Sequence, residues 1–422
     1  MNMDKNEPEI RFEGFSGEWI NKILVDVLSE RKILQKISSD APLLSFAAGQ
    51  GVIDRSERKS NNRDHLTLDQ ANKIFKLTEF NDIVYNPSNL KYGAIDRNKH
   101  GRGVISPIYV TFTTEEIPSF IEMIVKSEKF KLRALIYEEG TVVKRQSVKP
   151  ENLLSLDVNI SPSLDEQTKI GNYFQKLDGL INQHQKKHDK LSNIKKTMLE
   201  KMFPKVDETV PEIRFTEFSG DWDEHSFTES FTFVGTNTLS RADLNYEQGN
   251  AKNIHYGDIL VNFGQILDLN KEKLPFITSA DIAQKLSSRK LKDGDIVFAD
   301  AAEDDNVGKC TEILNVKNAT VLAGLHTIAA RPSQEHAPSY LGYYLNSNAF
   351  HNQLLTLMQG TKVLSISKTA INTTSIKSPK NASEQAKIGS YFQNLDELIS
   401  QHQQQIIKLK NIKLACLDKM FV

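Results

Sequence analysis

The sequence has little cysteine and no long apolar run. Its 422 residues include two cysteines, Cys310 and Cys416, far apart and without the spacing of a metal site. Neither a disulfide framework nor a cysteine-based zinc site is supported, so we expect two plain buried thiols. No apolar stretch approaches the roughly 20 residues that span a bilayer, and the start, MNMDKNEPEIRF, lacks a hydrophobic signal segment. We expect a cytoplasmic protein.

The chain also lacks an excess of charge of either sign. Lysine and arginine number 53 against 54 aspartates and glutamates, a net charge of −1. A protein that grips nucleic acid alone normally needs a basic surface, because it must neutralise phosphates. Either nucleic acid is not the ligand, or only local patches touch it while partner subunits supply much of the electrostatic attraction.

Signature motifs of several enzyme classes are missing. We find no P-loop, no GxSxG, no glycine-rich cofactor loop after a strand and no Asn-Pro-Pro-aromatic tetrad of a methyltransferase. The nearest match to that tetrad, at Asn86, lacks the second proline and the aromatic residue. The sequence therefore shows no catalytic motif. Its hydrophobic content of 39% and charged content of 25% are those of a globular protein, and its length suits two domains.

Two sets of internal repeats are present instead. Residues 8–19 read PEIRFEGFSGEW and residues 211–222 read PEIRFTEFSGDW, identical at 9 of 12 positions. Residues 166–203 and 384–421, each beginning Glu-Gln-x-Lys-Ile and ending Lys-Met-Phe, are identical at 24 of 38 positions. The segments between, roughly 20–160 and 223–377, share only scattered similarity. The retained segments favour a shared partner or packing surface, and the divergent segments favour recognition of two different ligands.

The longer repeat has a helical pattern. Ser163 and Asn381 each stand three residues before the first glutamate, as helix caps do. Apolar positions, with a histidine near the middle, recur at steps of three and four. We expect these seam residues to pack in a coiled coil and to serve partner binding: Ile170, Phe174, Leu177, Ile181, His184 and Leu191 in the first copy, and Ile388, Phe392, Leu395, Ile399, His402 and Leu409 in the second.

Each helix would be about 57 Å long at 1.5 Å per residue, more than a domain of this size needs internally. We predict two spacer helices that pack on each other antiparallel, with a pseudo-two-fold relation and a divergent domain at each end. His184 and His402 would then meet near the crossing. We interpret them as polar seam residues that set register; a metal or pH-sensing role is the alternative, which their glutamine neighbours do not favour.

The divergent segments predict a mixed α/β class with modest sheets. Expected strands are 83–85, 104–112, 258–263 and 295–299, and expected helices are 119–131 and 339–357. Because element order differs little between the halves, we expect one shared fold with altered loops.

Basic, amide and aromatic side chains gather in parts of these segments. Such groups suit DNA phosphates and base edges, although an ordinary solvated loop has the same composition. Residues 20–160 hold 21 basic against 18 acidic side chains, so the patch is only slightly basic. The predicted DNA-binding residues are Arg55, Arg58, Lys59, Arg63, Asn86, Asn89, Lys91, Tyr92, Arg97, Lys99, Arg102, Lys144 and Arg145 in the first half, and His255, Tyr256, Asn262, Lys309 and Lys362 in the second.

An acidic cluster in the second half is a further hint of a metal. Asp300, Glu303, Asp304 and Asp305 could suggest a metal-dependent nuclease, which needs converging carboxylates. The first half has no counterpart to this cluster, and no further catalytic groups accompany it. We interpret it as a polar loop near DNA or another chain, and we expect no catalytic residue and no bound metal.

Taken together, these features resemble the specificity subunits of type I restriction-modification systems. The likeness rests on the PEIRF segments at Pro8 and Pro211, the helices at Glu166 and Glu384, and His255-Tyr256-Gly257-Asp258, and it covers essentially the whole chain. It implies a first target-recognition domain at 1–160, spacer helix 161–203, a second target-recognition domain at 204–377 and spacer helix 378–422.

The resemblance also implies function and partners. Each domain would read half of a gapped, asymmetric site in double-stranded DNA. Two modification subunits would bind the repeated helices and bring S-adenosylmethionine for adenine methylation, and restriction subunits would bring ATP and Mg. This chain would bind no cofactor and catalyse nothing, and its near-neutral charge would reflect partners that carry phosphate contacts. Rival hypotheses are a coiled-coil adaptor that does not bind DNA and a nuclease built on Asp300.

Overall fold

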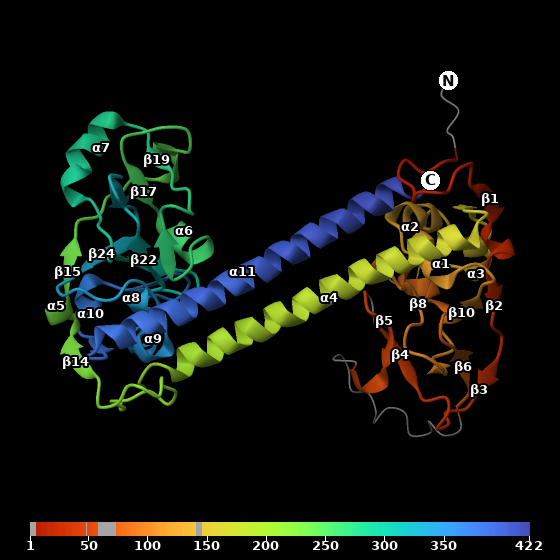
Figure 1. Ribbon diagram of the computed structural model, residues 1–422, viewed down its shortest axis with the longest axis horizontal. Coiled ribbons are helices and arrows are strands. Elements are labelled where there is room, and N and C mark those ends of the chain that lie inside the picture. Colours follow the sequence, from red (N-terminus) through yellow and green to blue (C-terminus); the bar gives the residue numbers. More distant parts are fainter. Residues whose placement is uncertain (1–5, 48, 58–72, 141–145) are drawn as a thin grey trace. The chain divides into compact units, whose positions relative to one another are not determined.

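The computed structural model describes residues 6–47, 49–57, 73–140 and 146–422. The chain divides into two compact units: unit 1 comprises residues 1–185 and 404–422, and unit 2 comprises residues 186–403. Within the described ranges, no helix combines the length and apolarity needed to cross a membrane. The units are described one at a time below, with the labels of Figure 1.

Unit 1 is built on a four-stranded antiparallel sheet in the order β2-β10-β7-β8, beside a three-stranded sheet β3-β6-β9. Helices α1 and α2 lie against the first turns of α4 (Figure 1), and Phe112, Phe120 and Phe174 join them in one core. The strands are β1 (Ile20–Ile23), β2 (Ser29–Glu30), β3 (Leu34–Gln35), β4 (Leu44–Ala47), β5 (Gly51–Asp54), β6 (Phe75–Thr78), β7 (Ile83–Tyr85), β8 (Ile95–Arg97), β9 (Gly103–Ile105), β10 (Val110–Thr113), β11 (Glu138–Glu139), β12 (Ser147–Val148) and β13 (Asp157–Ile160). The short helices are η1 (Leu24–Asp26), η2 (Arg55–Glu57), η5 (Pro87–Tyr92), α1 (Pro118–Val125), α2 (Glu128–Leu135) and α3 (Pro150–Leu154).

Unit 2 contains a five-stranded sheet, β15-β24-β20-β22-β18, and a four-stranded sheet, β16-β19-β17-β23. Pairs β18–β22 and β17–β23 are parallel and the other pairs are antiparallel. The strands are β14 (Asp223–Ser226), β15 (Phe231–Val234), β16 (Leu244–Asn245), β17 (Lys252–Ile254), β18 (Ile266–Asp268), β19 (Phe276–Ile277), β20 (Ile296–Ala299), β21 (Ala301–Ala302), β22 (Cys310–Leu314), β23 (Val321–Ala323), β24 (Thr327–Pro332), β25 (Leu364–Ser365) and β26 (Ser375–Ser378). The short helices are α5 (Phe227–Ser230), η7 (Arg241–Asp243), α6 (Tyr256–Val261), α7 (Ala280–Leu286), η8 (Ser287–Arg289), α8 (Tyr340–Leu345), α9 (Asn348–Leu355) and α10 (Lys368–Ile371).

The two units repeat one topology. The order β2-β10-β7-β8 in unit 1 matches β15-β24-β20-β22 in unit 2, where β18 is added. An antiparallel pair precedes each long helix, β1 with β13 before α4 and β14 with β26 before α11. A pair of short helices, α1–α2 or α8–α9, follows the main sheet in each unit. The expectation of a mixed α/β fold with an internal duplication is confirmed.

Both long helices have 38 residues: α4 spans Leu164–Lys201 and α11 spans Ala382–Lys419. In unit 1 the start of α4 packs on the end of α11, where the Tyr173 hydroxyl lies 3.6 Å from the Cys416 sulfur. In unit 2 the end of α4 packs on the start of α11, where Lys195 and Asp396 pair at 2.5 Å. The predicted antiparallel packing of the two helices is therefore seen in each unit.

Five local expectations from the sequence need correction. The expected helices 119–131 and 339–357 are each interrupted and form the pairs α1–α2 and α8–α9. Residues 258–263 are not a strand: α6 begins at Tyr256 because His255 caps it, accepting a hydrogen bond from the Gly257 N–H at 3.2 Å, and the helix buries Ile259 before it ends at Val261. Residues 104–112 form β9 and β10, separated by a turn at Pro107. Cys310 is buried as expected, but Cys416 is only half-buried.

Candidate nucleic-acid interface

The same ion pair fastens the PEIRF segment of each unit to a long helix. In unit 1 the Arg11 guanidinium binds both carboxylate oxygens of Glu166, at 2.5 and 2.8 Å. In unit 2 Arg214 binds both oxygens of Glu384, at 2.7 and 2.8 Å. Both arginines come from the PEIRF segment and both glutamates from the first turn of a helix. A bidentate pair with a buried carboxylate fixes orientation as well as distance.

The same segments also reach the end of the other helix. The Ile10 N–H donates to the Lys419 carbonyl in unit 1, and the Ile213 N–H donates to the Lys201 carbonyl in unit 2. Each PEIRF segment thus satisfies a carbonyl at one helix end and a carboxylate at the start of the other helix. This explains why the two repeats were retained together: they form one joint, built twice.

A glycine in each long helix permits close packing next to this joint. A β-carbon on Gly389 would lie 2.7 Å from the Pro338 carbonyl oxygen, and one on Gly171 would lie 2.1 Å from the Ser119 hydroxyl oxygen. The starts of α8 and α1 therefore approach the backbones of α11 and α4 where a side chain would not fit.

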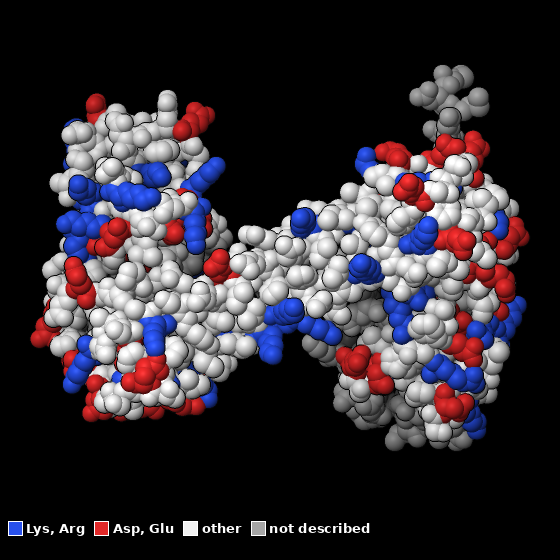
Figure 2. Space-filling model, in the orientation of Figure 1, with Lys and Arg blue, Asp and Glu red and all other residues white. Residues whose placement is uncertain are grey.

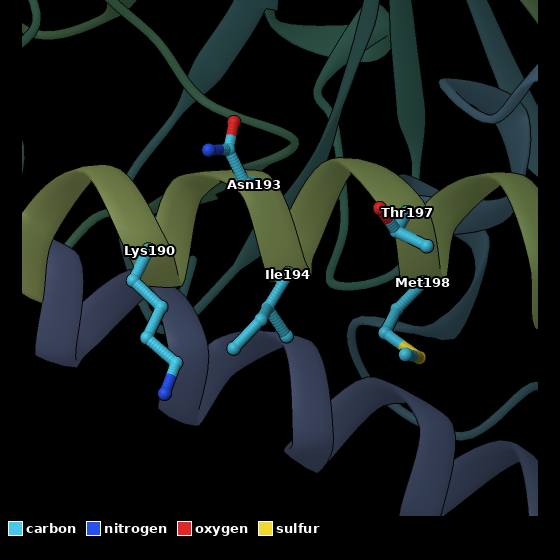
Figure 3. A pocket seen from close by; sticks show the side chains of 5 residues that line it. All are labelled: Lys190, Asn193, Ile194, Thr197 and Met198. Atoms are coloured by element: carbon cyan, nitrogen blue, oxygen red, sulfur yellow. The ribbon is translucent and has the colours of Figure 1, made fainter.

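The seam residues predicted on the long helices lie at two levels of burial. In Figure 3, Ile194 and Met198 point from α4 toward α11, and both pack on the core of unit 2. His184 belongs to unit 1 and His402 to unit 2, both half-buried, and a histidine pair stays a prediction. The buried seam residues are Ile170, Phe174, Leu177, Ile388, Phe392 and Leu395, and the half-buried ones are Ile181, Leu191, Ile399 and Leu409.

In unit 1, helix η5 carries three of the predicted DNA-binding residues, and a fourth, Asn86, is its N-cap. Asn86 is buried and caps the helix, because its side-chain oxygen accepts the Ser88 N–H at 3.0 Å. Asn89 and Tyr92 are exposed. Lys91 pairs with Glu138 at 3.4 Å. Asn89 and Tyr92 are thus accessible to a ligand, whereas Asn86 shapes the helix that presents them.

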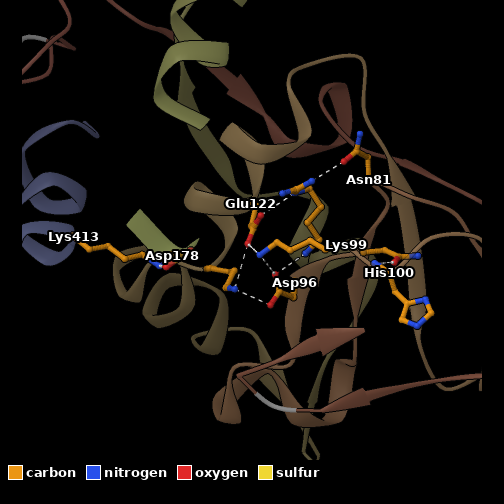
Figure 4. Close-up of polar contacts among 10 residues, drawn as sticks. Asn81, Asp96, Lys99, His100, Glu122, Asp178 and Lys413 are labelled. Atoms are coloured by element: carbon orange, nitrogen blue, oxygen red, sulfur yellow. Dashed lines mark hydrogen bonds and ion pairs between the residues drawn. The ribbon is translucent and has the colours of Figure 1, made fainter. Parts of the chain in front are cut away.

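A buried ionic cluster holds the next group of predicted residues (Figure 4). Glu122 of α1 accepts hydrogen bonds from Arg97 at 2.9 Å and from Lys99 at 2.5 Å. Burial raises the pKa of Glu122, but the charges of Lys99 and Lys126 and the hydrogen bonds from Lys99 and Arg97 outweigh it and lower the pKa to about 2. Arg97 is 5% exposed. Its position is that of an internal ion pair between β8 and α1, while Lys99 remains partly exposed at the turn that follows.

The other basic candidates of unit 1 lie at the surface or outside the described residues. Arg102 pairs with Glu79 at 2.7 Å, and Arg55 donates to the Ser45 hydroxyl at 3.3 Å. The predicted residues that fall outside the described ranges are Arg58, Lys59, Arg63, Lys144 and Arg145.

In unit 2 the His255-Tyr256-Gly257-Asp258 sequence surrounds the start of α6. The His255 ring lies 4.6 Å from that of Tyr256, which meets His326 edge-on at 5.2 Å. Burial and the neighbouring Arg241 charge lower the pKa of His255. Asp258 is buried and accepts hydrogen bonds from Asn262 at 2.9 Å and from Arg241 at 2.8 Å. These contacts link an exposed arginine and an exposed amide to the start of α6, where Tyr256 and His326 pair while the His255 side chain is buried.

Arg241 was not predicted, because its neighbours in the sequence, Ser240 and Ala242, give no basic or aromatic pattern. The Arg11–Glu166 pair was also missed, although both repeats keep the arginine and the glutamate, which was a usable signal. Two predicted lysines lie elsewhere in unit 2: Lys362 is exposed, and Lys309 donates to the Leu260 carbonyl at 2.9 Å, with burial lowering its pKa.

The carboxylates of the acidic segment in unit 2 do not form a common site. Asp300 pairs with His326 at 3.2 Å, whereas Glu303, Asp304 and Asp305 are exposed in the following loop. Among the described residues, no cluster of three or more histidine, cysteine or acidic side chains could hold a metal ion. Figure 2 shows acidic and basic groups interspersed on the visible face of each unit, as the net charge of −1 suggests.

Comparison with known proteins supports a nucleic-acid role. The family model for the type I restriction modification DNA specificity domain matches residues 220–411. A crystal structure of a type I restriction-modification S subunit from M. genitalium is 14% identical, with a TM-score of 0.55 over 99% of both chains. The HsdS subunit from Thermoanaerobacter tengcongensis is 15% identical, with a TM-score of 0.42 over 96% of both chains.

A further chain, from a structural study of the assembly and conformational transition of the type I R-M system, is 14% identical, with a TM-score of 0.49 over 96% of this chain and 97% of that one. Among curated protein sequences, none is similar enough to this chain to count as a match. Residues 220–411 match the family model of the type I restriction modification DNA specificity domain, and the whole chain shares its fold with the M. genitalium S subunit.

Proposed function

We propose that this chain is the specificity subunit of a type I restriction-modification complex and reads the two halves of a gapped, asymmetric DNA site. One observation carries the proposal: both units have the same scaffold. The Arg11–Glu166 ion pair of unit 1 recurs as Arg214–Glu384 in unit 2, and the strand order of the main sheet recurs as well, while the exposed side chains differ. Two copies of one scaffold with different surfaces suit two different half-sites. The long helices would set the gap between them.

The catalytic groups of the complex would belong to its partners. Two modification subunits would bring S-adenosylmethionine and methylate adenine, and restriction subunits would bring ATP and Mg²⁺ for translocation and cleavage. Exposed apolar side chains on the long helices support a partner surface there, because such groups gain from burial. Those on the two helices are Leu164, Leu398, Ile407 and Leu414.

The adenine to be methylated would have to leave the duplex to reach a modification subunit. This chain would therefore need to position the DNA without enclosing the target base. Its near-neutral charge fits an arrangement in which the partners supply many of the phosphate contacts.

The test is a methylome of a host that expresses this chain with its modification subunit. We expect one gapped, asymmetric adenine motif, absent from a host that expresses the modification subunit alone. Exchanging residues 20–160 for those of another family member should change one half of the motif and leave the other half intact. A chain that yields no motif, or an exchange that alters both halves, would refute the proposal.

A further inference from the structure

Arg241 is held at the surface of unit 2 by a buried carboxylate. Its Nη2 donates to Oδ1 of Asp258 at 2.8 Å, and the arginine side chain is 49% exposed while that of Asp258 is 3% exposed. The hydrogen bond that Arg241 donates to Asp258 raises the pKa of the guanidinium, which favours its charged form. Asp258 and the neighbouring Tyr246 side chain both hydrogen-bond this guanidinium, and the half-exposed side chain keeps its remaining donors accessible to solvent.

A second arginine of the same unit is held by its buried carboxylate at two points, although its side chain is still 31% exposed. Arg331 binds both oxygens of buried Asp295, with Nε–Oδ1 at 2.8 Å and Nη2–Oδ2 at 2.7 Å, and it donates again to the Lys290 carbonyl. Three contacts engage two of its nitrogens. The Arg241–Asp258 pair has a single bond instead, and Asp258 Oδ2 has no hydrogen-bond partner among the described residues.

The surroundings of Arg241 suit a base edge better than a bare phosphate. Tyr246 lies beside its guanidinium and is 64% exposed. Tyr256, two residues before Asp258 in the chain, forms an edge-on aromatic pair with His326, which is held by Asp300 at 3.2 Å. Rings and a fixed guanidinium offer planar faces and a donor fork, the chemistry that recognises a purine.

We propose that Arg241 reads a guanine in the half-site bound by unit 2, and that Asp258 is the positioning residue that aims it. A guanidinium fork matches the N7 and O6 acceptors of guanine in the major groove, and such a contact is the commonest base-specific one that proteins make. Holding the fork in place before binding reduces the ordering cost on contact with DNA. This inference rests on the proposed function and adds to it a residue and a base.

The first experiment maps the methylation motif for single variants of the full chain, co-expressed with its modification subunit. With Arg241→Gln, we expect one G·C position in one half of the motif to become degenerate and the other half to stay unchanged. Methylation at the original site should fall about 5- to 150-fold, the discrimination of a bidentate base contact. Asp258→Asn should relax the same position to a smaller extent. Arg331→Gln is the matched control and should leave the motif unchanged.

A second measurement separates base reading from phosphate contact. The assembled methylase is bound to DNA that carries 7-deazaguanine at the identified position, which removes the N7 acceptor. The wild-type complex should lose affinity, and the Arg241→Gln complex should not lose it again. An unchanged motif with Arg241→Gln, or an equal loss on all sequences with no deazaguanine effect, would overturn the inference while leaving the proposed function intact. A wild-type chain that directs no methylation would instead refute the proposed function.

Discussion

Arg11 and Glu166, 155 residues apart in the chain, form a bidentate ion pair that ties the N-terminal segment to the first turn of α4. Ser161 donates a further hydrogen bond to the same carboxylate at 2.5 Å. Because Arg214 and Glu384 repeat the pair in unit 2, the joint belongs to the common scaffold and not to either recognition surface.

Removing one partner of this joint should destabilise the chain. Arg11→Ala leaves the buried Glu166 carboxylate without its cation, which costs about 3 kcal/mol in comparable buried pairs. Thermal unfolding of the full chain should show the loss, and a double-mutant cycle with Glu166→Ala should give a coupling energy. If the losses in unfolding free energy of the two single variants simply added up in the double variant, Arg11 and Glu166 would not stabilise each other.

The same joint predicts a dependence on acid. Burial raises the pKa of Glu166, but the hydrogen bonds from Arg11 and Ser161 outweigh it, and the net pKa is lowered. A carboxyl with a lowered folded pKa contributes stability above its unfolded pKa, near 4.5, and that contribution disappears as the pH falls through the folded pKa. The free energy of unfolding of the wild type should fall as the pH is lowered from 6 to 3. With Glu166→Gln, the free energy of unfolding should fall less over the same pH range.

Burial should produce the opposite trend at Glu312. It raises the pKa of this side chain to about 7, against the lowering effect of N–H donors from Gly342 and Ser339. The stabilising contribution of the protonated form is complete below about 4.5 and is lost as the pH rises through about 7. Between pH 5 and pH 8, unfolding experiments should show a loss of about 3 kcal/mol that Glu312→Gln removes from the pH profile. A pH profile of unfolding that Glu312→Gln leaves unchanged would show that Glu312 does not cause the loss of stability.

Two glycines of the long helices should respond in opposite directions. Gly389→Ala places a methyl group 2.7 Å from the Pro338 carbonyl oxygen and should cost about 1–3 kcal/mol. Gly179→Ala is the matched control on α4: nothing lies within 4 Å, so the better helix propensity of alanine should stabilise the chain by about 1 kcal/mol. Calorimetry of both variants checks the signs, and a stabilising Gly389→Ala would show that the close approach is not constrained.

The isolated chain should bind its target poorly. With a net charge of −1, it has little attraction for phosphates by itself. We expect the affinity of the purified chain for its site to be weaker, and its discrimination lower, than those of the assembled methylase at the same salt concentration. Equal affinity and equal specificity would show that the partners are not needed for the electrostatic grip.

The repeats made much of the fold predictable. Identity at 24 of 38 positions, an apolar seam and a cap at Ser163 together require a long helix, because each signal indicates the same element. The strand prediction for residues 258–263 failed because the Ile-Leu-Val run suits a strand, whereas the capping bond from the Gly257 N–H to His255 begins a helix that buries Ile259.

The sequence by itself determined the duplicated order, the two long helices and the absence of recognisable catalytic motifs, since these depend on local pattern and repetition. Tertiary structure decided which charged groups are available to a ligand, because that depends on partners distant in the chain. The sequence predicted Arg97 as a DNA-binding residue, but Glu122, 25 residues away, binds its guanidinium inside the domain. Arg241 had no local signal, and it became a candidate only when folding placed the buried Asp258 carboxylate beneath it.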